Sequence, residues 1–158
     1  YRIEIMSFLT TLLYRNILWG ISQIRQLSGR TFEKILKEKG IDAFNGPQGR
    51  ILYVLWEQGE LSITDIARLT SLANTTLTGM LDRMEAQGLV VRIPDQHNRR
   101  RILIQLTPKA RRLQDAYDEV SEKNNAIFYA GFTQLEIQQF EAMLKRILQN
   151  YEEESQHE

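Results

Sequence analysis

Cysteine is absent from this sequence of 158 residues, which excludes a disulfide framework, a thiolate metal site and a thiol-based redox switch. His97 and His157 are the only histidines, and neither has a companion ligand at a suitable spacing, so we expect no metal site. The nucleophile and phosphate-loop motifs of common enzymes are also missing, and no motif indicates a cofactor. We therefore expect a protein that is not an enzyme and needs no cofactor.

Long apolar runs are missing too. None approaches the roughly 20 residues that a membrane-spanning helix needs, and no charged start followed by an apolar stretch and a cleavage site indicates secretion. We therefore expect a soluble, cytoplasmic protein without a membrane partner. The length allows one good hydrophobic core and is too short for two large independent domains.

The net charge is zero, but the charges are unevenly distributed. Residues 62–112 contain nine Lys and Arg against four Asp and Glu, whereas residues 113–158 contain three against ten. A basic centre suits a polyanion, and acidic flanks restrain non-specific binding. Chance fluctuation in an even mixture of charges is the alternative. The functional interpretation is favoured because the positive excess coincides with the motif described next.

Residues 62–106 have the pattern of two helices joined by a tight turn. Ser62 is a suitable N-cap for the first helix, with Asp65 in the position of a capping-box partner, and residues 70–73 break the pattern. The second helix runs from Asn74 to about Gln87. Its apolar residues recur at steps of three and four and therefore share one face, which contains Leu77, Met80, Leu81 and Met84.

A basic β-hairpin follows the second helix, which Gly88 can end in the left-handed conformation. Residues 89–93 and 101–106 alternate like strands, and the charged loop 94–100 connects them. Glu60 and Leu61 can add a very short third strand. Two helices and a basic hairpin make a winged helix-turn-helix, which places its second helix in the major groove of DNA.

At these residues the sequence resembles the MarR family of bacterial transcriptional regulators. The resemblance lies in residues 46–52, 69–78, 81–92 and the end of the hairpin at Leu106 and Thr107, and in their order and spacing it covers nearly the whole chain. It implies a mainly α fold with a small β-hairpin wing. A winged helix-turn-helix DNA-binding domain (47–106) would be joined to a helical dimerisation region (1–46 and 107–158).

The outer segments have apolar stripes that suit dimerisation. Residues 3–39 read as a long helix whose stripe is too long for one small domain to bury, so part of it should face another chain. A second helix should begin after Thr107 and continue to about Tyr129, and a capping box of Thr133 and Glu136 should open the last helix. A homodimer would present two recognition helices about one DNA turn apart to a pseudo-palindromic, double-stranded operator.

The resemblance also indicates which residues contact DNA. Threonine hydroxyls and methyls are reasonable readers of base edges, and threonine is a poor choice for a merely solvated helix face. Gly79 and His97 depart from the family pattern at positions where many relatives carry basic residues, and Asn98 replaces an aspartate, which weakens ion pairing within the wing. The candidate DNA-binding residues are Asn74, Thr75, Thr76, Thr78, Arg83, Arg99, Arg100 and Arg101.

Four aromatic residues are candidates for a ligand site, because MarR relatives often bind small aromatic compounds between the dimerisation and DNA-binding regions. They are Trp19, Phe44, Tyr53 and Trp56. For each residue taken singly, ordinary core packing explains an aromatic side chain at least as well.

The sequence thus predicts a dimeric winged-helix transcriptional regulator, a repressor whose operator binding a small ligand relieves by shifting a population of conformations. The alternative is a winged-helix module for protein–protein contact without specific DNA binding, since the fold alone does not prescribe DNA. The basic wing argues against that alternative.

Overall fold

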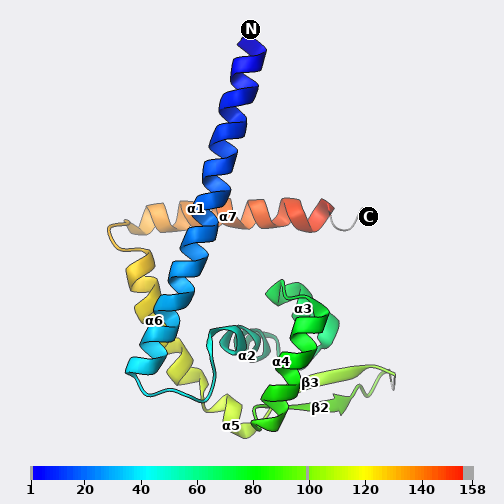
Figure 1. Cartoon of the computed structure of the whole chain (residues 1–158). Coiled ribbons are helices and arrows are strands. Elements are labelled where there is room, and N and C mark those ends of the chain that lie inside the picture. Colours follow the sequence, from blue (N-terminus) through cyan, green and yellow to red (C-terminus); the bar gives the residue numbers. More distant parts are fainter. Residues whose placement is uncertain (1, 99, 155–158) are drawn as a thin grey trace. The chain divides into compact units, whose positions relative to one another are not determined.

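The computed structural model describes residues 2–98 and 100–154, with side chains among them from residue 16 onward. It contains α1 (Arg2–Glu38), α2 (Gly46–Gln58), β1 (Leu61–Ser62), α3 (Ile63–Thr70), α4 (Asn74–Ala86), β2 (Val90–Pro94), β3 (Ile102–Leu106), α5 (Pro108–Arg111), α6 (Gln114–Phe128) and α7 (Gln134–Glu154), as Figure 1 shows. The predicted fold class is confirmed. Within the described part of the chain, no helix combines the length and apolar character needed to cross a membrane.

Contacts divide the chain into two compact units, which are described separately here. The winged unit contains the residues up to Asn124, and the C-terminal unit contains those from Asn125 on. The predicted division into a dimerisation region and a DNA-binding domain, at residues 46 and 106, stays a prediction.

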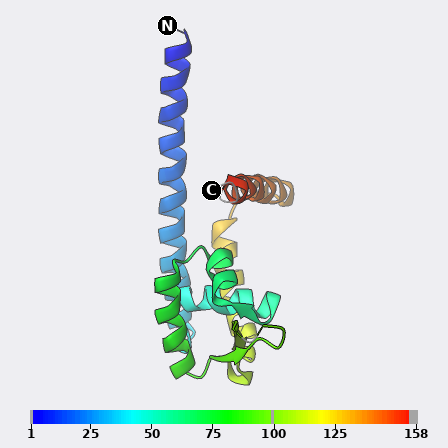
Figure 2. The ribbon, with the colours of Figure 1, turned by 90° about the vertical axis from the view of Figure 1, so that its right-hand side faces the viewer.

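The winged unit has one hydrophobic core, with α2 near its centre in the views of Figures 1 and 2. Leucine, isoleucine and methionine side chains from α2, α3, α4 and β3 meet there because each element carries an apolar face at the period of its secondary structure. The residues without exposed surface include Ile51, Leu52, Ile66, Leu77, Leu81, Met84 and Ile104. The predicted inner face of the second helix is therefore confirmed.

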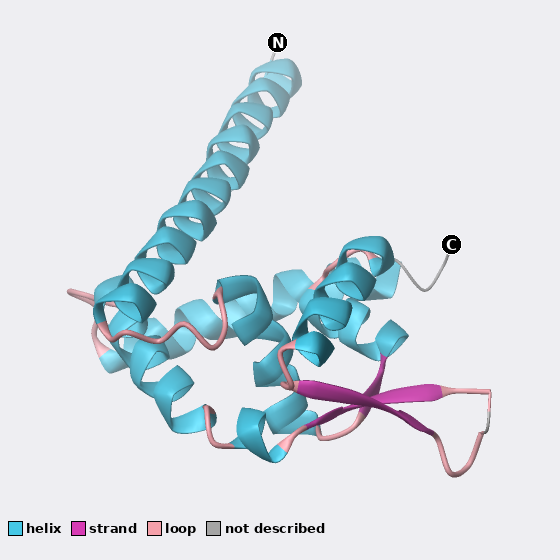
Figure 3. Ribbon diagram, turned by 60° about the horizontal axis from the view of Figure 1, so that its bottom comes forward, coloured by secondary structure: helices cyan, strands magenta, loops and turns pink. Residues whose placement is uncertain are grey.

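A small antiparallel sheet completes this unit, with its strands in the order β1–β3–β2. Strand β3 pairs with β2 from Val90 opposite Leu106 to Pro94 opposite Ile102, and with β1 at Leu61 opposite Ile104. The β2–β3 hairpin projects beyond the helices (Figure 3). Both the predicted hairpin and the very short third strand are confirmed.

Local caps explain where several helices begin and end. Ser62 caps α3 by accepting from the backbone N–H of Asp65 at 3.1 Å, and Gly88 follows α4 with φ 71°. In the C-terminal unit, Thr133 and Glu136 form the predicted capping box before α7. The Thr133 N–H donates to Glu136 Oε2 at 2.8 Å, and the Glu136 N–H donates to Thr133 Oγ1 at 3.3 Å. The N-cap at Ser62, the left-handed glycine after α4 and the capping box at Thr133 are therefore confirmed. The carboxylate of Asp65 accepts from the Ser62 hydroxyl instead of closing a capping box.

One prediction about the helices is wrong. The segment after Thr107, expected to be a single helix to about residue 129, is divided into α5 and α6. The indole N–H of Trp56 donates to the carbonyl of Ala110 at 3.2 Å, and the N–H of Leu113 donates to the same carbonyl at 3.1 Å in a three-residue step. This carbonyl is thus engaged by α2 and by a tighter turn, which interrupts the α-helical pattern.

Helix α1 is joined to the rest of the winged unit at its C-terminal half. Glu33 Oε1 accepts from the N–H of Gly46 at 2.6 Å, and Asn124 donates to the hydroxyl of Ser28 at 2.8 Å. Lys39 also forms an ion pair with Glu119 of α6. The long helix predicted for residues 3–39 is confirmed.

Candidate DNA-binding surface

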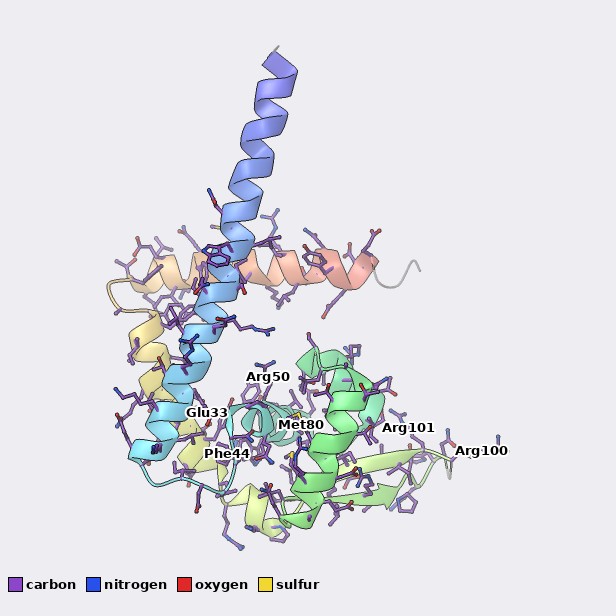
Figure 4. The ribbon with its side chains drawn as sticks, viewed as in Figure 1. Glu33, Phe44, Arg50, Met80, Arg100 and Arg101 are labelled. Carbon is purple, nitrogen blue, oxygen red and sulfur yellow. The ribbon has the colours of Figure 1, made fainter. Side chains whose placement is uncertain are left out.

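Helix α4 presents one face to the core and the other to solvent. Its apolar face is buried, and Met80, labelled in Figure 4, is only 6% exposed. The polar face consists of exposed side chains that include all the helix residues predicted to contact DNA. These are Asn74, Thr75, Thr76, Thr78 and Arg83. The structure therefore brings the five together on one accessible helix.

The first turn of α4 leaves backbone N–H groups without a side-chain cap. Its N-cap is Ala73, which supplies no capping hydrogen bond, in contrast to the serine that caps α3. Uncapped N–H groups at a helix N-terminus favour phosphate oxygens. The hydroxyl of Thr78 donates to the carbonyl of Asn74 at 2.9 Å, so it has only acceptor capacity left for a base.

An ion-pair network attaches the wing to α4. Arg92 on β2 contacts two carboxylates of α4, with Nη2 2.6 Å from Asp82 Oδ1 and Nη1 hydrogen-bonded to Glu85. Sequence reasoning missed this role of Asp82 and Glu85. The available signal was the pair of acidic residues three apart on one helix face, followed by an arginine in the adjoining strand.

At the tip of the wing, short polar side chains shape the loop. Asp95 Oδ1 accepts from the N–H of His97 at 2.8 Å, and Asn98 Oδ1 accepts from the N–H of Arg100 at 3.1 Å. Such bonds hold turns without ion pairing. Arg100 is exposed at the far end of the hairpin (Figure 4). Arg99, also predicted to bind DNA, lies outside the described residues.

Arg101 lies differently from its neighbour Arg100. Its Nη2 donates to Asp65 Oδ2 on α3 at 2.6 Å, and its Nε lies 4.0 Å from Asp95 Oδ2. Asp65 also accepts from the hydroxyl of Ser62 at 2.5 Å. The Ser62 hydroxyl, followed by the charges of Arg101 and Arg68, holds the pKa of the Asp65 carboxyl below its usual value, against the opposing effect of burial.

Three of the four aromatic ligand candidates meet around a residue that sequence reasoning did not select. The ring of Tyr117 on α6 lies with its centroid 6.0 Å from Phe44, 5.9 Å from Tyr53 and 5.2 Å from Trp56. Burial raises the pKa of the Tyr117 hydroxyl. Trp19 is not brought into this cluster and is 68% exposed on α1. The only sequence signal for Tyr117 was its place in the apolar stripe of its helix.

Two of the aromatic candidates, Trp56 and Phe44, each line a hollow of the winged unit. Trp56 lines a hollow of about 270 Å³ between α2 and the start of α6, together with Glu60 and Arg111. Phe44 lines a more open hollow of about 490 Å³, next to Gln48 and Gln87. Among the described residues, no group of three or more potential ligands is arranged to hold a metal ion.

Comparison with known proteins identifies the family. The model of the MarR family matches residues 44–102. The regulator FarR of Neisseria gonorrhoeae is 34% identical over 109 residues, 68% of this chain and 73% of FarR. The chain belongs to the MarR family. A repressor of the homoprotocatechuate degradative operon of Escherichia coli is 27% identical over 129 residues, 82% of this chain and 85% of the repressor.

A solved structure of a protein bound to DNA has the same fold. Reduced AbfR bound to DNA is 26% identical, with a TM-score of 0.70 over 92% of this chain and 98% of AbfR. The protein is thus a MarR-family, DNA-binding transcriptional regulator, and this supports the DNA-binding interpretation over that of a protein–protein module.

MarR-family proteins are dimeric. In this protein, large apolar side chains are exposed to solvent in both units. On α1 of the winged unit, Ile17, Ile24 and Leu27 are each about half exposed. In the C-terminal unit, Leu135 and Leu148 are each more than 60% exposed, and α7 has no buried residue. Large apolar side chains gathered on exposed helices are typical of protein interfaces.

Proposed function

We propose that this MarR-family regulator binds its operator with the exposed face of α4 in the major groove and with Arg100 in the adjacent minor groove. The supporting observation is the joint exposure of the threonine face of α4 and of the wing-tip arginine, on two elements that Arg92 connects. Arginine at a hairpin tip suits the narrow minor groove, where the negative potential is strongest.

The positions of the side chains on α4 support a role for each of them in this proposal. Asn74, Thr75 and Thr76 lie in the first turn of α4, where recognition helices contact base edges. Thr78 contributes as an acceptor, because its hydrogen is donated within the helix. Arg83 is exposed further along the same helix and suits a phosphate contact.

The proposed operator is a pseudo-palindrome. A two-fold dimer presents two copies of α4, and half-sites about 10 base pairs apart match one turn of DNA. Selection of bound duplexes from a randomised library tests this proposal. We expect an inverted repeat to be enriched, with an affinity that falls steeply as salt rises because phosphate contacts release counterions. Recovery of unrelated sequences, or an affinity independent of salt, would contradict it.

We also propose that a small aromatic ligand relieves repression by binding beside Tyr53 and Trp56. Tyr53 is 46% exposed while its ring stacks on Tyr117, so one face of the aromatic cluster is accessible from solvent. A ligand that favours a conformation with mismatched recognition helices lowers DNA affinity in proportion to its preference for that conformation. Trp19 and Phe44 remain candidates, one on exposed α1 and the other in the core.

Tryptophan fluorescence tests the ligand proposal, because Trp19 and Trp56 are the only tryptophans. Salicylate-like compounds should quench the fluorescence of the Trp19→Phe variant, which retains Trp56 as its reporter. The same compounds should also release operator DNA from the protein. The matched variant Trp56→Phe should respond weakly. Unchanged emission from Trp19→Phe at millimolar ligand would assign the cluster to core packing.

The cellular setting follows from the same proposal. A regulator that binds bacterial operators works in the cytoplasm, and its activity is binding and release rather than catalysis. Repression, rather than activation, is supported by the relative named as a repressor of a degradative operon.

A further inference from the structure

The two arginines at the end of the wing have neighbouring positions and different surroundings. Arg100 lies at the far end of the wing in Figure 4, whereas Arg101 lies nearer the helices, where it donates to Asp65 of α3. The side chain of Arg101 is 47% exposed, yet its guanidinium is already engaged by Asp65. An arginine bound in this way has fewer donors free for a phosphate.

The acceptor of Arg101 is itself held in place. Asp65 lies in the first turn of α3, where its backbone N–H donates to the Ser62 hydroxyl and its carboxylate accepts from the same hydroxyl. The carboxylate is therefore fixed on the helix-turn-helix. Arg101, which lies 36 positions later in the chain, donates to it.

The backbone of Arg101 occupies the boundary between the paired strands and the wing loop. The last strand pair joins Pro94 and Ile102, and beyond it the N–H of Asp95 donates to the Arg101 carbonyl at 2.9 Å. The N–H of Arg101 in turn donates to the Asn98 carbonyl at 2.8 Å. Fixing the side chain of Arg101 thus fixes the point from which the loop departs.

We propose that Arg101 is a positioning residue, which connects the base of the wing loop to α3 and so orients Arg100 toward DNA. The effect on DNA rests on the proposed function, since it requires that Arg100 contacts the minor groove. Arg92 attaches the β2 side of the hairpin to α4, and Arg101 attaches the β3 side to α3. The wing is then held on both of its strands.

A direct phosphate contact by Arg101 makes the opposite prediction for Asp65. If Arg101 neutralised phosphate, Asp65 would compete for it, and Asp65→Asn would strengthen DNA binding. If Arg101 orients the wing, Asp65→Asn weakens binding, and a variant that also carries Arg101→Ala is no weaker than Arg101→Ala alone. We expect each single change to lower operator affinity about two- to fivefold, the range of one partly exposed ion pair.

The salt dependence and the coupling to Arg100 give two further readouts. Arg101→Ala should leave the slope of affinity against salt unchanged, whereas losing a phosphate contact lowers that slope by about one. In the Arg101→Ala background, Arg100→Ala should cost less than it does in the wild type, because a displaced wing has already lost part of that contact. Full additivity, or a stronger Asp65→Asn, would overturn the proposal.

Amide hydrogen exchange without DNA tests the positioning separately. Arg101→Ala and Asp65→Asn should both accelerate exchange across residues 95–101. Arg100→Ala and the matched control Arg68→Ala, which removes a charge 3.9 Å from the same carboxylate, should not. Unchanged exchange in the first pair would refute the positioning role. If exchange accelerates but Arg100→Ala leaves DNA affinity intact, the positioning stands and the proposed minor-groove contact fails.

Discussion

Replacing Thr76 by alanine separates base contact from helix stability. Thr76 is exposed in the first turn of α4 and contributes nothing to the buried face of that helix. Alanine has a helix propensity about half a kcal/mol better than that of threonine, so the free energy of unfolding should stay equal or rise slightly. A loss of DNA affinity in this variant therefore cannot come from a destabilised helix.

The expected loss of binding free energy on the operator is about 1–3 kcal/mol, which corresponds to a dissociation constant roughly 5- to 140-fold larger. Thr78→Ala is the matched control, because its hydroxyl hydrogen already serves the carbonyl of Asn74 and only acceptor capacity is lost. Its loss should be smaller than that of Thr76→Ala. On a duplex of scrambled sequence, both variants should bind nearly as the wild type does, since phosphate contacts dominate non-specific binding.

Fluorescence anisotropy with labelled operator and scrambled duplexes, at one fixed salt concentration, measures the affinity of both variants for both duplexes. Thermal unfolding of the same samples checks that both variants are folded. Equal losses for Thr76→Ala on the two duplexes would refute base readout and assign this residue to the phosphate backbone.

The remaining predictions concern the wing, the aromatic cluster and acid stability. Arg100→Ala should weaken binding most where the flanking steps are rich in A and T, with major-groove preferences unchanged in a binding profile across operator mutants. Gly49→Ala should destabilise the fold by up to about 2 kcal/mol in urea unfolding, because the added Cβ would lie 3.0 Å from the Tyr117 ring, which packs against the rings of Phe44, Tyr53 and Trp56 and has little room to move. This cost exceeds the roughly 1 kcal/mol that alanine gains over glycine within a helix. The lowered pKa of Asp65, caused first by the Ser62 hydroxyl, means that its contribution to stability is complete above the unfolded pKa of about 3.9. The difference in the free energy of unfolding between wild type and Asp65→Asn should therefore disappear as the pH falls through the lowered pKa that Asp65 has in the folded protein.

Short-range patterns were sufficient for the order of the elements and for much of the DNA-binding face. Caps act between residues three or four apart, so Ser62 before α3 and the pair of Thr133 and Glu136 before α7 were readable without a structure. The apolar period of α4 likewise determined which of its faces is buried. Because the threonines occupy the remaining positions, their exposure followed from the same period.

Contacts between distant residues decided the rest. The bond from Trp56 to the carbonyl of Ala110 joins residues 54 apart, and it accompanies the division of one expected helix into α5 and α6. Arg101 looked like its basic neighbours until the fold placed it beside Asp65, and Tyr117 became the centre of the aromatic cluster only through packing. Side-chain periodicity determines which face of an element is buried, but it does not determine which partner that face meets, since many pairings bury similar apolar area. The partners of individual side chains are therefore a property of the tertiary structure.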